Sequence, residues 1–193
     1  MASLATCARC DNSFQIFHED RAFYETFQVP EPKNCPECRL VRRLMERNTK
    51  HLSYRSCNLT GERTLSQYHA DQPCPVYSPA SWWSDAWDGT AYGRDIDWNR
   101  PFFEQFYELK KQVPHCALFV TEGTTENSDF NNCAAYLKNC YLVAETDYAE
   151  DCYYSNLIKK CKSIVDSSVC YESELLYECA DVTGSYRLLY SQD

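Results

Sequence analysis

Two Cys-x-x-Cys pairs are the residues of this chain best suited to chemistry. Cys7 and Cys10 form the first pair, and Cys35 and Cys38 form the second. Four thiolates at this spacing can close a tetrahedral zinc site with Zn–S bonds of about 2.3 Å. Because such a site leaves no position open for water, the pattern predicts one structural Zn²⁺ ion and not a catalytic one.

The segment between the pairs must bring them together. Residues 14–17, FQIF, alternate like a short strand, and residues 18–27 can form about two turns of helix. Phe23 and Phe27 are four positions apart and share one face of that helix, so we expect them to cover the small zinc core.

The cysteines and their flanking residues carry a family resemblance. The pattern Cys7-x-x-Cys10, Phe14 and Cys35-Pro-Glu-Cys38-Arg39 resembles the probable zinc-ribbon domain family, a small bacterial module, over about the first 47 residues. This resemblance implies that the four cysteines are zinc ligands, and it implies no activity. The order of a cysteine module, an aromatic middle and a Cys/Tyr-rich repeat is similar to that of uncharacterised bacterial zinc-ribbon proteins.

A basic segment, RLVRRLMERN, follows Cys38 and is rich in helix formers. We expect Leu40, Val41 and Leu44 to face inward and the arginines to face outward. A zinc-anchored basic helix could bind RNA or DNA. The candidate contacts are Arg39, Arg42, Arg43, Arg47, Lys50 and Arg55. Alternatively, the basic stripe is a solvated face or meets acidic residues of the chain itself.

The charge distribution limits where a polyanion could bind. The formal net charge is -9, yet residues 33–63 contain eight Lys or Arg against three Asp or Glu, whereas residues 122–193 contain five against thirteen. A nucleic-acid contact should therefore centre on the basic segment.

Residues 54–77 are expected to form a β-hairpin around the turn Asn58-Leu-Thr-Gly61. Alternatively, cysteines and histidines of this region could bind a second metal ion. Its ligands would be His51, Cys57, His69 and Cys74, although their spacing matches no established metal motif and buried thiols are favoured.

An amphipathic helix is expected next, with Asn99 as its cap, Pro101 in its first turn and Pro114 at its end. Phe102 and Phe106 lie on one face, which we expect to link the core of the zinc module to the rest. The preceding Asp/Trp-rich segment allows a third, enzymatic hypothesis of the glycosidase kind. Turn-forming Asp and packed Trp are favoured there; these residues are Asp85, Asp88, Asp95, Asp97, Trp82, Trp83, Trp87 and Trp98.

The C-terminal part repeats around cysteine. Cys152, Cys161, Cys170 and Cys179 follow one another at a step of nine residues, and alternate cysteines lie about 18 to 21 apart. This period predicts a β-solenoid whose coils bury the thiols. Further metal or iron–sulfur ligation and an antiparallel β domain are the alternatives.

These patterns predict an α+β fold that is mostly β. It comprises a zinc-ribbon or treble-clef-like module (1–50), an aromatic-rich linking region (51–120) and a β-solenoid-like repeat (121–193). The favoured function is a non-catalytic, zinc-stabilised interaction or scaffold protein, with nucleic-acid binding as the alternative. Because Asp193 lies within what reads as another repeat, we expect either that the protein continues beyond it or that a protein partner or a second copy covers the open end.

The thirteen cysteines bear on the compartment in which the protein is expected, since an odd number of them argues against a complete set of disulfides. The N-terminus lacks the features of a signal peptide, and no apolar run approaches the roughly 20 residues of a membrane span. We therefore expect a cytoplasmic protein without a membrane partner, whose cysteines stay reduced.

Overall fold

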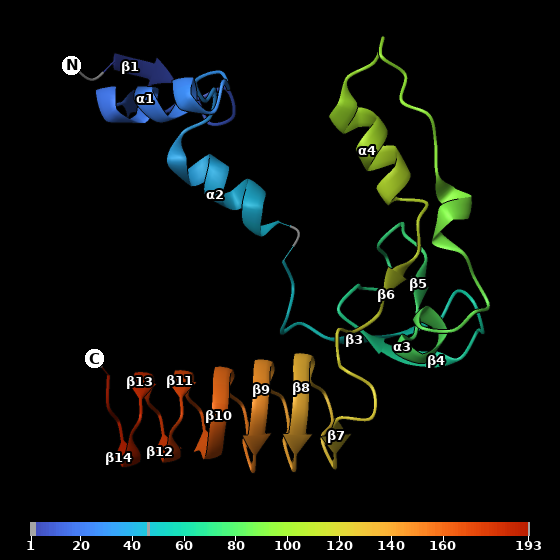
Figure 1. Cartoon of the computed structure of the whole chain (residues 1–193), viewed down its shortest axis with the longest axis vertical. Helices are drawn as coiled ribbons and strands as arrows, with labels where there is room; N and C mark the ends of the chain where they lie inside the picture. The colour runs from blue at the N-terminus through green and yellow to red at the C-terminus, as the bar shows by residue number, and fades with distance from the viewer. Residues whose placement is uncertain (1–2, 46, 193) are drawn as a thin grey trace. The chain divides into compact units, whose positions relative to one another are not determined.

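The computed structural model describes residues 3–45 and 47–192 and has the expected α+β architecture, mostly strand. The chain divides into two compact units, Met1–Asn48 and Thr49–Asp193 (Figure 1). All thirteen cysteines lie within the described residues and are free thiols.

The first unit is a small hairpin with two helices. Its elements are β1 (Ser3–Thr6), β2 (Ser13–Ile16), α1 (His18–Thr26) and α2 (Pro36–Leu44), and β1 pairs antiparallel with β2. The alternation expected around Phe14 is present, because Phe14 and Ile16 are buried while the residues before each are exposed. These two side chains pack with Cys7 and Cys35 into a core that Tyr24 partly covers.

Two expectations for this unit are wrong. Phe23 and Phe27 are 64% and 71% exposed, so they do not cover the core, because α1 turns the neighbouring face, with Tyr24, toward the cysteines. Leu40, Val41 and Leu44 of α2 are about half exposed instead of facing inward.

The second unit begins with an irregular part that contains the expected hairpin. The strands β3 (Ser53–Ser56) and β4 (Arg63–Ser66) pair antiparallel across the turn at Gly61, whose φ is +77°. The strands β5 (Val76–Tyr77) and β6 (His115–Cys116) pair in parallel. Between them lie α3 (Pro79–Trp82), a 3-10 helix (Gly89–Tyr92) and α4 (Phe102–Lys110).

The helix α4 differs from its expected form. It begins at Phe102 with Pro101 as its N-cap residue, and it ends at Lys110. Asn99 is not the cap, because its backbone N–H and side chain bond to Asp97 in a preceding turn. Phe102 and Phe106 stack with ring centroids 6.0 Å apart and are about half exposed, and their expected link to the zinc module stays a prediction.

The rest of the second unit is a β-solenoid of about five turns (Figure 1). Its strands pair in parallel, which excludes an antiparallel β domain. They are β7 (Thr125–Glu126), β8 (Asn132–Lys138), β9 (Ala144–Glu150), β10 (Asn156–Val165), β11 (Ser168–Tyr171), β12 (Glu174–Tyr177), β13 (Ala180–Thr183) and β14 (Tyr186–Leu189).

Each coil contains 12 residues, not the 18 to 21 expected from the cysteines. Asn132 pairs with Ala144, Ala144 with Asn156, and Asn156 with Ser168. The nine-residue cysteine step is three quarters of a coil, so successive thiols lie on successive sides of the interior. The thiol of Cys161, for example, lies 3.2 Å from the carbonyl oxygen of Cys170.

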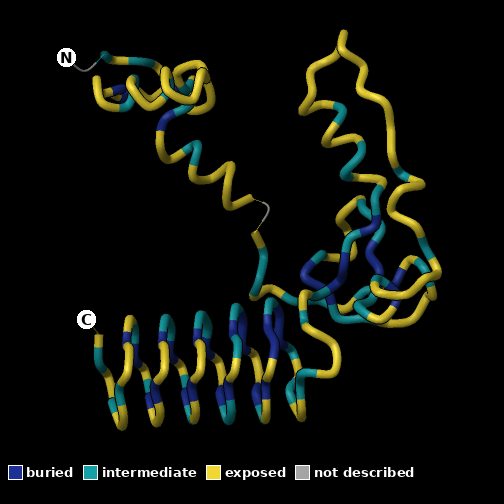
Figure 2. The backbone as a smooth tube through the Cα atoms, viewed as in Figure 1, coloured by how far each residue is buried: buried dark blue, intermediate teal, exposed yellow. Residues whose placement is uncertain are grey.

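The coil is built from triplets. Every third residue from Asn131 to Val182 is buried (Figure 2). The residue two positions after each buried one is left-handed, with φ values of 45° to 61° recurring every three residues from Asn127 to Tyr190. Because left-handed backbone costs about 1 kcal/mol or more at a non-glycine residue, a single coil could not hold this shape without its neighbours.

Polar residues inside the coil satisfy one another. The hydroxyl of Ser155 accepts a hydrogen bond from the N–H of Ser167, twelve residues later, and donates to the carbonyl of Tyr153. Ser173 makes the same pair of bonds with Ser185 and Tyr171. A small hydroxyl therefore fits an inward position as well as a thiol does, because each of these serines both accepts and donates a hydrogen bond.

Candidate metal centre

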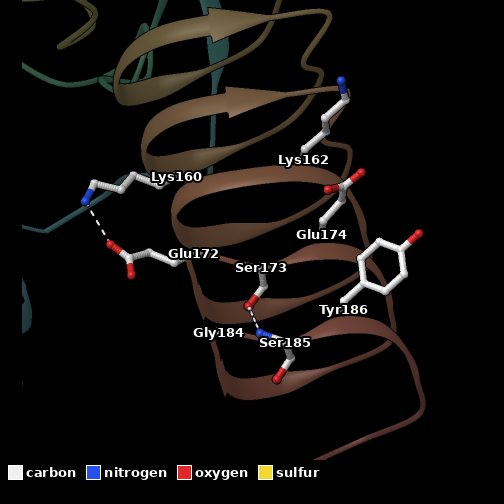
Figure 3. Close-up of a pocket in the computed structure, with 8 residues that line it drawn as sticks. All are labelled: Lys160, Lys162, Glu172, Ser173, Glu174, Gly184, Ser185 and Tyr186. Carbon is white, nitrogen blue, oxygen red and sulfur yellow. Dashed lines mark hydrogen bonds and ion pairs between the residues drawn. The ribbon is translucent and has the colours of Figure 1, made fainter.

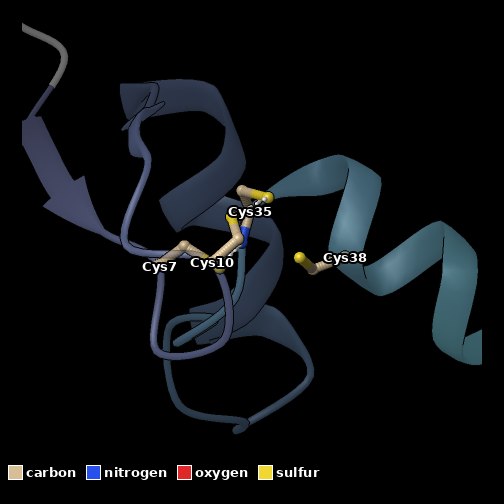
Figure 4. Close-up of side chains that lie close together, drawn as sticks. All are labelled: Cys7, Cys10, Cys35 and Cys38. Atoms are coloured by element: carbon tan, nitrogen blue, oxygen red, sulfur yellow. Dashed lines mark hydrogen bonds between the residues drawn. The ribbon is translucent and has the colours of Figure 1, made fainter.

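The four predicted cysteine ligands converge in the first unit (Figure 4). The sulfur atoms of Cys7, Cys10, Cys35 and Cys38 all lie within 4.8 Å of one another. Cys7 and Cys10 lie in the turn between β1 and β2, where Asp11 is left-handed with φ of 58°. Cys35 is the N-cap residue of α2 and Pro36 is its first helical residue, so the second pair is held by a helix start.

Backbone N–H groups point at the first sulfur. The N–H of Cys35 donates to Sγ of Cys7 at 3.2 Å, and that of Arg9 donates to the same atom at 3.5 Å. The bond from Cys35 is the main cause that lowers the pKa of Cys7 to about 6. A thiolate, the form that binds metal, is therefore favoured at Cys7 near neutral pH.

The other sulfurs also lie close to one another. Sγ of Cys10 and Sγ of Cys35 are 3.8 Å apart, and burial raises the pKa of Cys38 to about 12. A bound divalent cation would reverse that effect, because a coordinated thiol loses its proton. These four residues fit a metal ion by number, chemistry and mutual distance.

The alternative second metal site is not formed. Over residues 3–45 and 47–192, the four cysteines of the first unit are the only group with metal-ligand geometry. His69 instead lies against Asp71, with Nδ1 and Oδ2 3.1 Å apart. The cysteines of the solenoid interior likewise form no cluster of this kind within the described chain.

Cys57 has a set of partners that we did not anticipate from the sequence. Its sulfur accepts from the N–H of Ser78 at 3.3 Å and lies 3.5 Å from Oγ of Ser81. Ser78 Oγ and Ser81 Oγ are 2.9 Å apart. Serine is common in turns and at helix starts, so the presence of Ser78 and Ser81 in the sequence does not by itself predict that they contact Cys57.

The candidate nucleic-acid contacts fall into both units. Arg39, Arg42 and Arg43 lie in α2, where Arg42 and Arg43 are exposed and Nη1 of Arg39 is 3.5 Å from the hydroxyl of Tyr24. Arg47 follows the helix.

Lys50 and Arg55 belong to the second unit and have internal partners. Nζ of Lys50 donates to Oδ1 of Asn156 at 2.8 Å, and the guanidinium of Arg55 donates to the carbonyls of His69 and Cys74, each at 3.2 Å.

The Asp/Trp-rich segment forms local turns and ring contacts. Asp88 accepts from the N–H of Thr90 at 2.8 Å as the cap of the 3-10 helix. The rings of Trp82 and Trp87 lie 4.7 Å apart, and Trp87 Nε1 donates to the carbonyl of Trp82. Asp88, Trp82 and Trp87 thus take the turn and packing roles favoured from the sequence, whereas Trp83 and Trp98 are 72% and 87% exposed and are not packed.

A shallow hollow of about 460 Å³ lies on the outside of the solenoid (Figure 3). Lys160 and Glu172 form an ion pair of 2.8 Å at its border. Lys162, on the other border, lies 3.4 Å from Glu150 of the preceding coil. These exposed charges are therefore already paired along the coil stack, and ion pairs exposed to solvent in this way contribute little to stability.

No described helix is long and apolar enough to cross a lipid bilayer. No family model matches the chain, and no curated protein or solved structure is significantly similar to it. The zinc-ribbon resemblance therefore depends on the cysteine spacing and the residues around it.

Proposed function

We propose that the protein is a non-catalytic interaction or scaffold protein whose first unit is stabilised by one structural zinc ion. The convergence of Cys7, Cys10, Cys35 and Cys38 is the observation that carries this proposal. A soft, all-thiolate tetrahedral set suits zinc, and four protein ligands leave no coordination position for water or substrate.

The solenoid supplies the interaction surface. Its outer faces present tyrosines that are half or more exposed, among them Tyr136 and Tyr148, whose rings stack 4.4 Å apart, and Tyr154. Tyrosine is enriched in protein interfaces because it offers a large apolar ring and one hydroxyl. The partner is a protein, either another chain or a second copy of this one.

A metal count tests the zinc proposal. We expect one zinc ion per chain by elemental analysis of the purified protein. A strong chelator should remove that zinc and lower the melting temperature of the first unit, because metal binding contributes directly to folding. Protein without zinc, or an apo form that melts like the metal-loaded form, would contradict the proposal.

RNA or DNA binding is the second candidate function. It is favoured by the exposure of Arg42 and Arg43 on a helix that starts at a candidate metal ligand. Binding through about four phosphate contacts should weaken roughly 100-fold between 50 and 200 mM salt, because counterions are released on binding.

We expect the double variant Arg42→Glu, Arg43→Glu to abolish this binding at low salt. The double variant Lys159→Glu, Arg187→Glu makes the same change of charge at exposed residues of the solenoid and should bind like the wild type. Fluorescence anisotropy with a labelled RNA measures both. If the wild type shows no binding even at low salt, this function is excluded.

A further inference from the structure

Residues 53–66 repeat the local structure of residues 3–16 at a constant offset of 50. In each segment a four-residue strand, a cysteine turn and a second four-residue strand form an antiparallel hairpin in the same register: Ser3 pairs with Ile16, and Ser53 with Ser66. Cys57 is at the position of Cys7.

The turns match bond for bond. The N–H of Cys7 donates to the carbonyl of Asn12 at 2.9 Å, and that of Cys57 donates to the carbonyl of Glu62 at 2.8 Å. The turn closes in each case on a left-handed residue, Asp11 or Gly61, whose N–H returns to the carbonyl of the cysteine.

The second half of each module also matches, with a constant offset of 43. Cys35 and Ser78 are both N-cap residues, and each is followed by a proline at the first helical position. The N–H of Cys35 donates to Sγ of Cys7 at 3.2 Å, and the N–H of Ser78 donates to Sγ of Cys57 at 3.3 Å.

A further pair of bonds joins the halves of each module. The N–H of Ala8 donates to the carbonyl of Lys33 at 2.9 Å, and the N–H of Asn58 donates to the carbonyl of Val76 at 2.8 Å. Both acceptors lie two residues before the N-cap residue. The backbone that presents the four sulfurs in the first unit is therefore present twice in the chain.

The correspondence assigns a residue to each ligand position. Thr60 corresponds to Cys10, Ser78 to Cys35 and Ser81 to Cys38. Cys57 is 1% and Ser81 is 7% exposed. Neutral hydroxyls are poor ligands for zinc, but here they bond to one another and to the sulfur, so the interior of the turn is filled by hydrogen bonds.

The electrostatics of Cys57 agree with this correspondence. Burial raises the pKa of its thiol, but hydrogen bonds from Thr60, Ser78 and Ser81 outweigh burial and lower the pKa to about 6. The pKa of Cys7 is also lowered to about 6, chiefly by the matching backbone bond.

We propose that Cys57, Thr60, Ser78 and Ser81 occupy the four ligand positions of a second zinc knuckle. Hydrogen bonds among these residues take the place of the metal ion. The backbone retains the geometry that would hold four cysteine thiolates around a tetrahedral metal ion. The ligand that this backbone would take is a thiophilic divalent cation such as Zn²⁺ or Co²⁺. In the native sequence the module folds without one.

Restoring the thiols tests the proposal. The triple variant Thr60→Cys, Ser78→Cys, Ser81→Cys should bind one zinc ion more per chain than its parent, and Co²⁺ loading should increase thiolate-to-cobalt absorption accordingly. Made on a Cys35→Ser background, which disables the first site, the triple variant should still gain one tight metal ion. This keeps the result independent of the first unit.

The matched control is the quadruple variant that also carries Cys57→Ser. With one thiolate fewer, it should bind the additional metal at least 10-fold more weakly. A triple variant that folds normally but gains no tight metal ion would overturn the proposal. A triple variant that gains no tight metal ion and also fails to regain wild-type amide protection over residues 53–66, when refolded with zinc, would overturn it as well.

Amide hydrogen exchange on the wild type is an independent measurement. Chelation should leave residues 53–66 and 76–82 as protected as before, since their knuckle holds no metal. Loss of protection in these segments on chelation would show a resident metal and overturn the proposal.

Discussion

Replacing Cys35 by serine is expected to unfold the first unit while the solenoid stays intact. Cys35 supplies a candidate metal ligand, a buried part of the core and the N-cap position of α2. Among the described residues of this unit only four form its buried hydrophobic core, too few for a unit of about 50 residues to fold without a metal ion or a disulfide.

The size of the effect follows from metal binding. A structural zinc contributes on the order of 10 kcal/mol to a small domain, which is comparable to the whole stability of a typical one. Loss of one of four thiolates removes most of that contribution. No compensating core is available within the described part of the first unit.

Hydrogen–deuterium exchange followed by mass spectrometry measures this result. Amides of β1, β2 and α1 should exchange at the rate of an unfolded chain, whereas those of β8, β9 and β10 should keep wild-type protection. Cys74→Ser is the matched control, because Cys74 lies outside the cluster. Persistent protection of β1 and β2 in the Cys35 variant would contradict the metal-dependent fold.

Replacing Leu176 by alanine should have the second large effect, a loss of about 2 to 5 kcal/mol in the free energy of unfolding of the second unit. Leu176 is 2% exposed and points into the solenoid. Ile164 and Leu188 occupy the same inward position one coil before and one coil after it. The alanine would leave a cavity between two coils that cannot close without breaking the strand pairing.

Leu175→Ala is the neighbouring control. Leu175 is the left-handed residue of its triplet and is 41% exposed, so its truncation should cost less than about 1 kcal/mol. Urea denaturation monitored by circular dichroism gives both values. Equal losses, or a larger loss at Leu175, would show that the inward position of the triplet has been assigned wrongly.

The parts of the fold that the sequence predicted are those in which residue type determines backbone shape. Paired cysteines at a two-residue gap identified the four-cysteine cluster, and Asn58 with Gly61 identified the hairpin turn. The alternation around Phe14 identified β2. In each case the chemistry acts over a few residues, so tertiary packing could not reverse it.

The predicted coil length is wrong because cysteines occupy inward positions on more than one side of the coil. Cys152 and Cys161 lie on different sides of the interior, and residues of other types fill the intervening inward positions. Small or apolar residues recur every three positions, as in Cys152, Ser155 and Ile158, and this period was the better indicator of the triplet.

Helix faces were the other error. Phe23 and Phe27 share a face, but which face of a short helix is buried depends on tertiary contacts, and Tyr24 was selected instead. The second knuckle cannot be predicted from the sequence, because Thr60, Ser78 and Ser81 differ from cysteine in type. Only the repeated hydrogen bonds show that the backbone is the same.

The triplet coil acts as a reading frame for insertions and deletions. Adding twelve residues lengthens the stack by one coil and leaves every later side chain on its original side, whereas adding three moves the later chain by one side. Deleting a single residue after Cys161 would turn Tyr171 and Glu174 inward, where only small or apolar groups fit. Such a repeat should therefore change length by duplication of whole coils, as a coding sequence tolerates changes in whole codons.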